Sequence, residues 1–368
     1  MTLAAAAAQS GKRLLSLDFM RGLIMVLLIM ESTGLYEHLS DASQGTAVNG
    51  FIQQFFHHPW NGLRFWDLIQ PGFMFVAGTA MAYSLHKQAS QGLTWRESFK
   101  KILKRCFWLF FWGVLDYAVK PKGLAFELWD VLSQLSFTTL VAFLIFRWKA
   151  SAQIIFCIGL LLLTEILYRF TNVAGFDQPF TDQHNFGNYV DLLLMNKINK
   201  GGWVAINCLP TAVHTIAGAL VGKLFLSGKE KIKPLLIWAV ICLAAGYALD
   251  LAGITPIVKR IATTSFTLAS LGWCLIGLAA CYWWIDGRDH KKYLSFFVIV
   301  SMNSIFIYLF FEILGSWFNR YVGTVTNGLM GFINTPETMK LIITSLCIFT
   351  LEWLLCYFLY RKKIFFKL

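Results

Sequence analysis

Long apolar runs, separated by short charged or turn-forming segments, recur along the whole chain. Each run approaches the length of about 20 residues that an α-helix needs to cross a bilayer. The runs lie at about 16–36, 63–85, 102–119, 128–147, 152–169, 203–226, 234–251, 262–285, 293–316 and 338–360. This pattern predicts an all-α, polytopic membrane protein with about ten transmembrane helices. The inner connections are short and no soluble appendage stands out, so we expect a single transmembrane domain over residues 1–368.

Composition supports the same class. Hydrophobic residues make up 57% of the chain and charged residues only 14%, whereas soluble domains carry about 25% charged residues. No small-residue cleavage site closes the first apolar run, so we expect a retained first helix and not a cleaved signal peptide. The eight cysteines lie almost entirely in apolar runs without CxxC spacing. We interpret them as small core residues and predict neither disulfides nor a metal site.

The net charge of +12 is distributed unevenly. If the N-terminus is cytoplasmic, 21 lysines and arginines fall in inner segments and nine in outer segments. The positive-inside rule therefore predicts that both termini are inside. Two outer segments are long, at about 37–62 and 170–202, and could form a vestibule. No basic stripe lies on a soluble module, so we expect the bilayer and no nucleic acid as a partner.

Several polar residues lie at the ends of the predicted helices or inside them, where they are rare and often functional. Asp18 and Arg21 are three residues apart and could pair on one helical face. Glu31 and Ser32 end the first run, where they are either solvated at the interface or part of a site.

The stretch "HHPWNGLRFWD" precedes the second run. Proline fits the first turn of a helix, because its missing N–H is not needed there. A carboxylate such as Asp67 near an imidazole such as His57 can raise its basicity, as a general base requires.

A stripe of small and polar residues follows in "NCLPTAVHTIAGALVGK" at 207–223. It contains Asn207, Thr211, Thr215, Gly218 and Gly222, with His214 beside it. Such a stripe either packs helices closely or lines a cavity. Both interpretations stay open.

These motifs together resemble one family. The segments "RLLSLDFMRGLIMVLLIMES", "HHPWNGLRFWDLIQPGFMFVAG", "INCLPTAVHTIAGALVGK", "VKRIATTSFTLASLGW" and "MNSIFIY" occur in order along nearly the whole chain. They resemble heparan-alpha-glucosaminide N-acetyltransferase and its smaller bacterial inner-membrane relatives. The H-x-x-W-N-G pattern followed by D-L is the most specific element.

The resemblance implies a transmembrane acetyl transfer from cytosolic acetyl-CoA to the amine of a glucosamine-type acceptor, which is a sugar, a glycan end or a muropeptide. It places the chain in the inner membrane with its active site toward the periplasm. It makes His57 the catalytic base or acetyl carrier and implies roles for Asp67, Lys259, Ser265 and Asn303. It also draws attention to Arg21 in the D-x-x-R-G element.

Two departures from the family leave roles open. Ser32, preceded by Glu31, stands where the lysosomal enzyme has a catalytic asparagine, and Asn49 could enter the site from the following loop. Gln134 stands near a position where the family usually has an arginine. The predicted acceptor-binding residues are Asn49, Trp60, Asn61, Lys259, Ser265 and Asn303, the predicted catalytic residues His57, Asp67, Glu31 and Ser32, and the predicted acetyl-CoA-binding residues Arg21, Arg105, Gln134, His214 and Lys223.

Alternatives from other classes stay open at this level. A non-catalytic transporter of sugars or cell-wall fragments would also need a polar cavity with access from both sides. A membrane O-acyltransferase of surface polysaccharides would transfer to hydroxyl groups in place of amines. The basic residues of "KKILKR" at 100–105 and Lys223 fit the phosphates of coenzyme A or serve topology alone. If copies of the chain associate, a homodimer is the most frequent arrangement.

Overall fold

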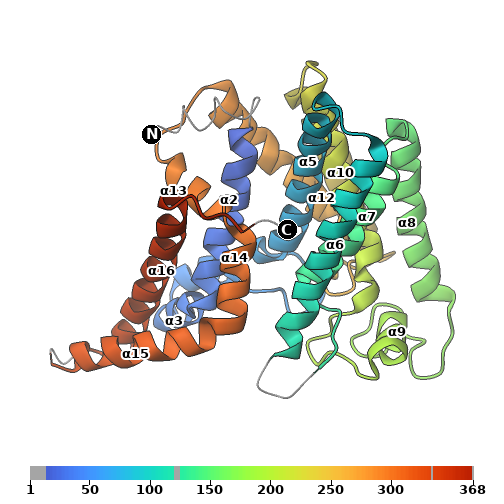
Figure 1. Ribbon diagram of the computed structural model, residues 1–368. Coiled ribbons are helices and arrows are strands. Elements are labelled where there is room, and N and C mark those ends of the chain that lie inside the picture. Colours follow the sequence, from blue (N-terminus) through green and yellow to red (C-terminus); the bar gives the residue numbers. More distant parts are fainter. Residues whose placement is uncertain (1–13, 120–124, 333–334, 367–368) are drawn as a thin grey trace. The chain divides into compact units, whose positions relative to one another are not determined.

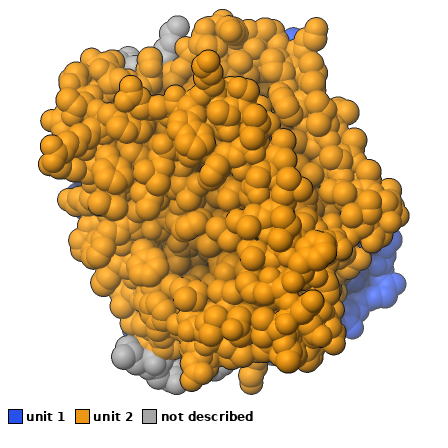
Figure 2. All heavy atoms as spheres, turned by 90° about the vertical axis from the view of Figure 1, so that its right-hand side faces the viewer, with its two compact units in different colours: residues 1–57, 284–367 blue, residues 58–283, 368 orange. Residues whose placement is uncertain are grey.

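A computed structural model describes residues 14–119, 125–332 and 335–366 (Figure 1). Five charges of the orientation count lie outside these residues: Lys12, Arg13, Lys120, Lys122 and Lys367. The first predicted run lies within them and forms a helix, while its retention stays a prediction. The described residues form two compact units. Unit 1 comprises those of 1–57 and 284–367, and unit 2 those of 58–283. Figure 2 colours the units separately and shows one face of unit 2. A single domain over residues 1–368 stays a prediction.

Unit 2 is built from eight α-helices and two short 3₁₀ turns within its described residues. Its elements are η2 (Phe65–Leu68), α5 (Ile69–Ser90), α6 (Trp95–Ala118), α7 (Val131–Leu144), α8 (Ala150–Phe170), α9 (Phe186–Met195), η3 (Ala205–Asn207), α10 (Cys208–Leu226), α11 (Ile232–Leu251) and α12 (Thr264–Cys281). Helices α5 and α10 pack against each other along their length, α6 packs on α7, and α11 on α12. The α5–α10 pair therefore forms the centre of the unit.

Small residues bring the backbones of α5 and α10 together. A Cβ atom on Gly78 would lie 1.9 Å from the carbonyl oxygen of Thr215, and one on Gly218 would lie 2.0 Å from that of Phe75. The small residues of the stripe at 207–223 thus serve helix packing, as in other membrane helix pairs. Its threonines add hydrogen bonds, because Thr215 Oγ1 donates to Thr138 Oγ1 of α7 at 3.0 Å.

Unit 1 combines the first helices of the chain with the last. Its elements are α2 (Leu15–Ser32), α3 (Leu35–Ala42), α4 (Ala47–Ile52), η1 (Gln53–Phe55), α13 (Leu294–Ser301), α14 (Ser304–Leu309), η5 (Phe310–Leu314), α15 (Gly315–Gly331) and α16 (Glu337–Arg361). Helix α2 packs on α13, and α16 contacts α2, α3, α13 and α15 (Figure 1). The predicted pair is confirmed, since Arg21 Nη1 lies 3.8 Å from Asp18 Oδ1.

The predicted run 293–316 is not one straight helix. It breaks after Ser301, and the chain from Ser304 to Gly331 is bent by 73° from α13. Asn303 lies at the break and is buried. Its amide donates to the Ile364 carbonyl oxygen at 3.0 Å, and its Oδ1 accepts from Phe366 N–H at 2.9 Å. These two bonds attach the C-terminal segment to the break between α13 and α14.

The all-helical, multi-pass membrane class is confirmed. Among the described residues, six helices are long and apolar enough to cross a membrane, and a seventh if the bent pair counts as one span. The other predicted runs do form helices, but α7 has only 14 residues, and α2 and α6 carry several charges. The count of ten and the orientation therefore stay predictions.

Candidate active site

The W-N-G segment of unit 2 lies against the chain just before Lys259. Gly62 N–H donates to the Ile257 carbonyl oxygen at 2.8 Å, and Asn61 forms an isolated antiparallel bridge with Val258. Gly62 has φ +148°, and a Cβ there would lie 2.6 Å from Nε2 of His58. Glycine is thus required by the backbone and by the His58 imidazole packed over it.

Asp67 ties this turn to Lys259. Its side chain is fully buried, and its Oδ2 accepts from the backbone N–H of Arg64 at 2.9 Å and of His58 at 3.2 Å. Its Oδ1 lies 3.7 Å from Nζ of Lys259, whose side chain is only 7% exposed. A buried lysine needs such a partner, because an isolated charge loses its hydration without compensation.

The position of Asp67 bears directly on His57. The peptide bond that joins His57 to His58 carries the N–H that donates to Asp67. Asp67 therefore holds the backbone N–H of His58, the residue that follows His57. His57 is the last residue of unit 1 and is half-buried. The sequence reasoning gave little weight to His58, whose Nδ1 is buried without a hydrogen-bond partner in the described part of the chain.

The second long loop packs onto the same segment of unit 2. Trp60 Nε1 donates to the Phe180 carbonyl oxygen at 2.9 Å. The Arg260 guanidinium carbon lies 5.9 Å from the Trp60 ring centroid, and Lys259 Nζ lies 5.4 Å from that of Trp203. Two indole rings and two cations thus gather beside the buried carboxylate of Asp67. Indole faces and cationic groups are suited to a polar, ring-shaped ligand.

Asp191 anchors this loop and was missed by the sequence analysis. It is fully buried on α9, accepts from Trp129 Nε1 at 2.9 Å and accepts from Ala205 N–H at 2.9 Å. Burial raises the pKa of the Asp191 carboxyl to about 6, although both hydrogen bonds act in the opposite direction. An aspartate beside the apolar "LLLM" at 192–195 was the available signal.

Ser265 lies in the first turn of α12 and bonds back to the segment before it. Its hydroxyl donates to the Pro256 carbonyl oxygen at 2.7 Å, and Thr263 Oγ1 also donates to that oxygen at 2.7 Å. Ala262 has φ +55°, so the turn after Lys259 is tight. Ser265 is fully buried and serves this turn. A direct contact with acceptor stays a prediction.

A chain of buried polar side chains continues through the interior of unit 2. Gln70 Nε2 donates to Gln134 Oε1, and Gln134 Nε2 donates to the Trp129 carbonyl oxygen at 3.2 Å. His214 Nε2 lies 2.9 Å from Ser270 Oγ. His214 Nδ1 is buried without a hydrogen-bond partner among the described residues. These groups make the interior of the helix bundle partly polar.

A basic cavity lies at the C-terminal end of α10. Its volume is about 680 Å³, and its lining includes His86, Trp95, Ser98, Phe146, Arg147 and Lys223. Lys223 Nζ donates to the Phe146 carbonyl oxygen and lies 4.1 Å from that ring's centroid. The Arg147 guanidinium carbon lies 5.5 Å from the Trp95 ring centroid. Arg147 and His86 were not predicted here, and Arg105 is not among the lining residues.

The remaining predicted site residues belong to unit 1. Ser32 Oγ donates to the Ile29 carbonyl oxygen at 2.8 Å, and the Ser32 carbonyl oxygen accepts from Asn319 at 2.7 Å. Asn49 Nδ2 donates to the Ser40 carbonyl oxygen at 3.0 Å within the first long loop. Glu31 is half-buried in the last turn of α2. Their predicted roles, with those of Arg21 and Asn303, stay predictions.

Comparison with known proteins agrees with the resemblance read from the motifs. No family model matches the chain. Mouse heparan-alpha-glucosaminide N-acetyltransferase is 30% identical over 152 residues, which cover 38% of this chain and 20% of the mouse protein. The human protein of the same name is 23% identical over 426 residues, covering 97% of this chain. The match covers 60% of the length of the human protein. The predicted resemblance to these N-acetyltransferases is confirmed at low identity.

Proposed function

We propose that the protein is a transmembrane acetyltransferase. It moves an acetyl group from cytosolic acetyl-CoA to the amine of a glucosamine-type sugar on the opposite side of the membrane. In the resembling family's bacterial setting, this is the inner membrane with the acceptor site toward the periplasm. The proposal extends the activity named for the mouse and human relatives to a chain that aligns with part of their length.

The observation that carries this proposal is the separation of two polar sites along one helix. Asn207, just before α10, donates to the Arg260 carbonyl oxygen at 3.3 Å beside the buried ion pair. Lys223, near the end of α10, lines the basic cavity. At about 1.5 Å per helical residue the two ends lie about 24 Å apart. That distance approaches the hydrocarbon thickness of about 30 Å, so the sites suit ligands on opposite sides.

At the acceptor end, acetylation needs a base and a stabiliser of negative charge. The sugar ammonium loses one proton, its nitrogen attacks the thioester carbonyl, and the bond to sulfur breaks to release coenzyme A thiol. In our proposal His57 takes the proton, and Asp67 holds the N–H of the following residue, His58. Lys259 supplies a cation toward the developing oxyanion, and Trp60 and Asn61 contribute to the sugar site.

At the other end, the basic cavity suits the phosphates of coenzyme A. Arg147 and Lys223 supply cations for the phosphates, and His86 supplies a third polar group. Lysine and arginine are the usual phosphate-binding side chains. The buried amides of Gln70 and Gln134 offer polar groups along the interior between the two sites.

The test is transfer of radiolabelled acetyl from acetyl-CoA to glucosamine by the purified full chain in detergent. We expect transfer by the wild type and loss of at least about 100-fold in His57→Ala, the scale of general-base catalysis. His58→Ala is the matched control, because it shows which of the two adjacent histidines transfer depends on. Thermal unfolding of each variant establishes that it is folded.

Several outcomes would decide against the proposal. Transfer to hydroxyl groups alone would favour the O-acyltransferase. No transfer to any amino sugar, together with no rise in melting temperature on adding acetyl-CoA, would overturn the enzyme proposal and favour a transporter.

The same assay without acceptor distinguishes two mechanisms. A burst of coenzyme A release would identify an acetyl-enzyme intermediate, and the absence of a burst would indicate direct transfer.

A further inference from the structure

Glu352 of unit 1 is a carboxylic acid inside α16, a helix long and apolar enough to cross a membrane. It lies nine residues before Arg361, the end of the helix, which is about 14 Å along the helix axis. The residue is 0% exposed, and both carboxyl oxygens are buried without a hydrogen-bond partner in the described part of the chain. Ionisable side chains inside membrane helices are rare and often functional.

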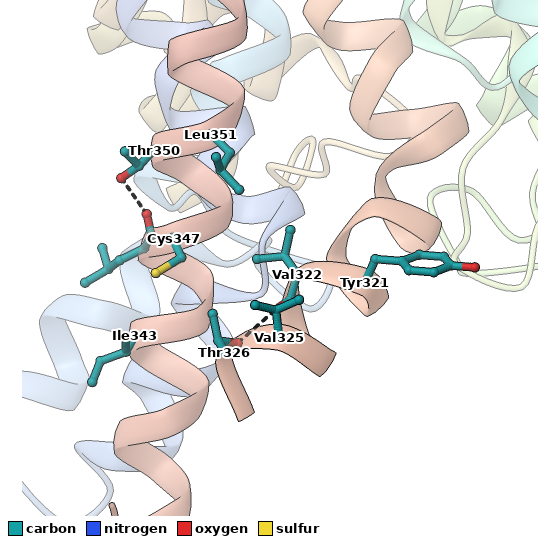
Figure 3. Close-up of a pocket in the computed structure, with 9 residues that line it drawn as sticks. Tyr321, Val322, Val325, Thr326, Ile343, Cys347, Thr350 and Leu351 are labelled. Atoms are coloured by element: carbon teal, nitrogen blue, oxygen red, sulfur yellow. Dashed lines mark hydrogen bonds between the residues drawn. The ribbon is translucent and has the colours of Figure 1, made fainter. Parts of the chain in front are cut away.

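Glu352 belongs to the side of α16 that packs against the protein. Only 22% of the apolar window of this helix is buried. Its buried residues are spaced three or four apart and so share one side: Ser345, Ile348, Glu352 and Cys356. A different side of the helix, which includes Cys347, lines an apolar groove beside α15 (Figure 3). Glu352 is not among the residues of that groove.

The buried side of α16 packs on α2 and α13. Trp353, the residue after Glu352, donates from Nε1 to the Phe296 carbonyl oxygen of α13 at 3.1 Å. Its ring stacks on that of Phe296, with centroids 5.2 Å apart. Helices α2 and α13 approach closely in turn, because a Cβ on Gly22 would lie 2.1 Å from the Phe297 carbonyl oxygen. Glu352 is therefore on a helix face that two tightly packed neighbours cover.

The ionisable side chains of these neighbours have other partners or lie elsewhere. Helix α13 carries none. On α2, Asp18 pairs with Arg21 at 3.8 Å. On α3, His38 Nδ1 lies 3.0 Å from Ser345 Oγ, which is about two helical turns from Glu352. The other ionisable side chains of α2 and α3 follow Ile29 in the chain, toward the Ser345 end: Glu31, Tyr36, Glu37 and Asp41.

Helix α15, the remaining neighbour of α16, carries Arg320 and Tyr321. The Arg320 guanidinium carbon lies 5.9 Å from the Tyr321 ring centroid, and both residues are exposed. Among the described residues, no cation therefore compensates an ionised Glu352. An uncompensated carboxylate in such surroundings is far less favourable than the neutral acid.

We propose that Glu352 is a proton-binding site in unit 1, and that the bound proton keeps α16 packed against α2 and α13. When the proton leaves to water, a carboxylate remains at a site that offers it no partner. The new charge is stabilised only by hydration, so water enters and the buried side of α16 separates from its neighbours. The site requires none of the residues proposed for acetyl transfer.

The first test is infrared difference spectroscopy of the full chain in detergent at neutral pH, comparing wild type with Glu352→Gln. An ordinary glutamate is ionised at this pH. We expect the wild type to show the carbonyl stretch of a protonated carboxyl, shifted in heavy water, and the variant to lose it. Glu337→Gln, whose side chain is 71% exposed at the start of α16, is the matched control and should keep the band.

A second variant, Glu352→Leu, makes the same comparison with a side chain that suits apolar surroundings. Thermal unfolding establishes which variants are folded. A wild-type spectrum without a band that the folded variants lack would overturn the proposal, because Glu352 would then be ionised at neutral pH.

The second test follows alkylation of two cysteines of α16 by N-ethylmaleimide, mapped by mass spectrometry. Cys356 is one turn from Glu352 and fully buried, whereas Cys347 is half-buried on the groove side. As the pH rises from neutral to alkaline, Cys356 should lose its protection in the wild type and keep it in Glu352→Gln. Cys347 should react alike in both proteins, which controls for the higher reactivity of thiols at alkaline pH.

The same course of Cys356 alkylation with pH in wild type and variant would overturn the role of the proton in packing. Neither test uses acetyl-CoA or an acceptor sugar. Failure of the proposed acetyl transfer would therefore leave both results interpretable.

Discussion

Two lysines lie near opposite ends of α10 in different surroundings: Lys259, in the segment before α12, and Lys223, on α10 itself. Lys259 is buried and lies 3.7 Å from the carboxylate of Asp67. Lys223 is half-buried and contacts a carbonyl oxygen and the ring of Phe146, with the exposed Arg147 in the same cavity. A paired, buried lysine is held in one geometry and supports its surroundings. A lysine in an open basic cavity is available to an anionic ligand. The difference predicts that the free energy of unfolding depends more on Lys259 than on Lys223.

The largest effect should come from breaking the buried pair. Lys259→Met leaves the Asp67 carboxylate without this cation, and we expect a loss of about 3–5 kcal/mol in the free energy of unfolding. Lys259→Met combined with Asp67→Asn should recover part of that loss, because no uncompensated charge remains. Unfolding in detergent, followed by tryptophan fluorescence, measures both.

The control for this prediction is the exposed pair of Lys291 with Asp289, whose side chains are 54% and 74% exposed. Lys291→Ala should change stability by less than about 1 kcal/mol. If Lys259→Met lowers the free energy of unfolding no more than Lys291→Ala does, the buried pair of Lys259 with Asp67 does not stabilise the fold.

A second prediction concerns the pH dependence of stability and Asp191, which anchors the loop at 170–202. Burial raises the pKa of Asp191 to about 6 from its ordinary value of 3.8. The folded protein therefore binds this proton more tightly than the unfolded chain. The resulting stability is present at about pH 4 and is lost as the pH rises to about 6. The shift of about two pKa units corresponds to about 3 kcal/mol.

Asp191→Asn removes this titration. The difference in melting temperature between wild type and variant should change between about pH 4 and 6 and level off above it, with the wild type losing stability relative to the variant. A difference that is constant over this range would contradict the assignment. The amide also gives up one of the two acceptor atoms, so a pH-independent loss is superimposed.

The smallest effect should appear at the Lys223 end, in binding more than in stability. Lys223→Ala and Arg147→Ala should each raise the KM for acetyl-CoA about tenfold, which is about 1.4 kcal/mol, with little change in melting temperature. Lys229→Ala, in the exposed segment after α10, is the matched charge control. An unchanged KM in both cavity variants would leave these residues with a role in topology alone.

Local patterns determined the class of the protein and much of its helix placement. Alternation of apolar runs and turn signals located helices in all ten predicted segments, because hydropathy and helix length are properties of consecutive residues. Spacing along one helix also predicted the pairing of Asp18 with Arg21. The motif order was sufficient for the resemblance that the comparisons confirm at low identity. The sequence left two interpretations of the stripe at 207–223 open, because it does not show which helix packs against the stripe.

The tertiary structure alone decided which distant residues meet. Asp67 and Lys259 are far apart in sequence and come together because η2 packs against α12 and the segment before Lys259 pairs with the W-N-G turn. The Lys223 cavity likewise needs the ends of three helices. Asn303 holds the C-terminal backbone at a helix break that periodicity did not reveal. Each of these contacts depends on side-chain packing between elements, and a hydrophobic pattern along one segment contains no information about its partner.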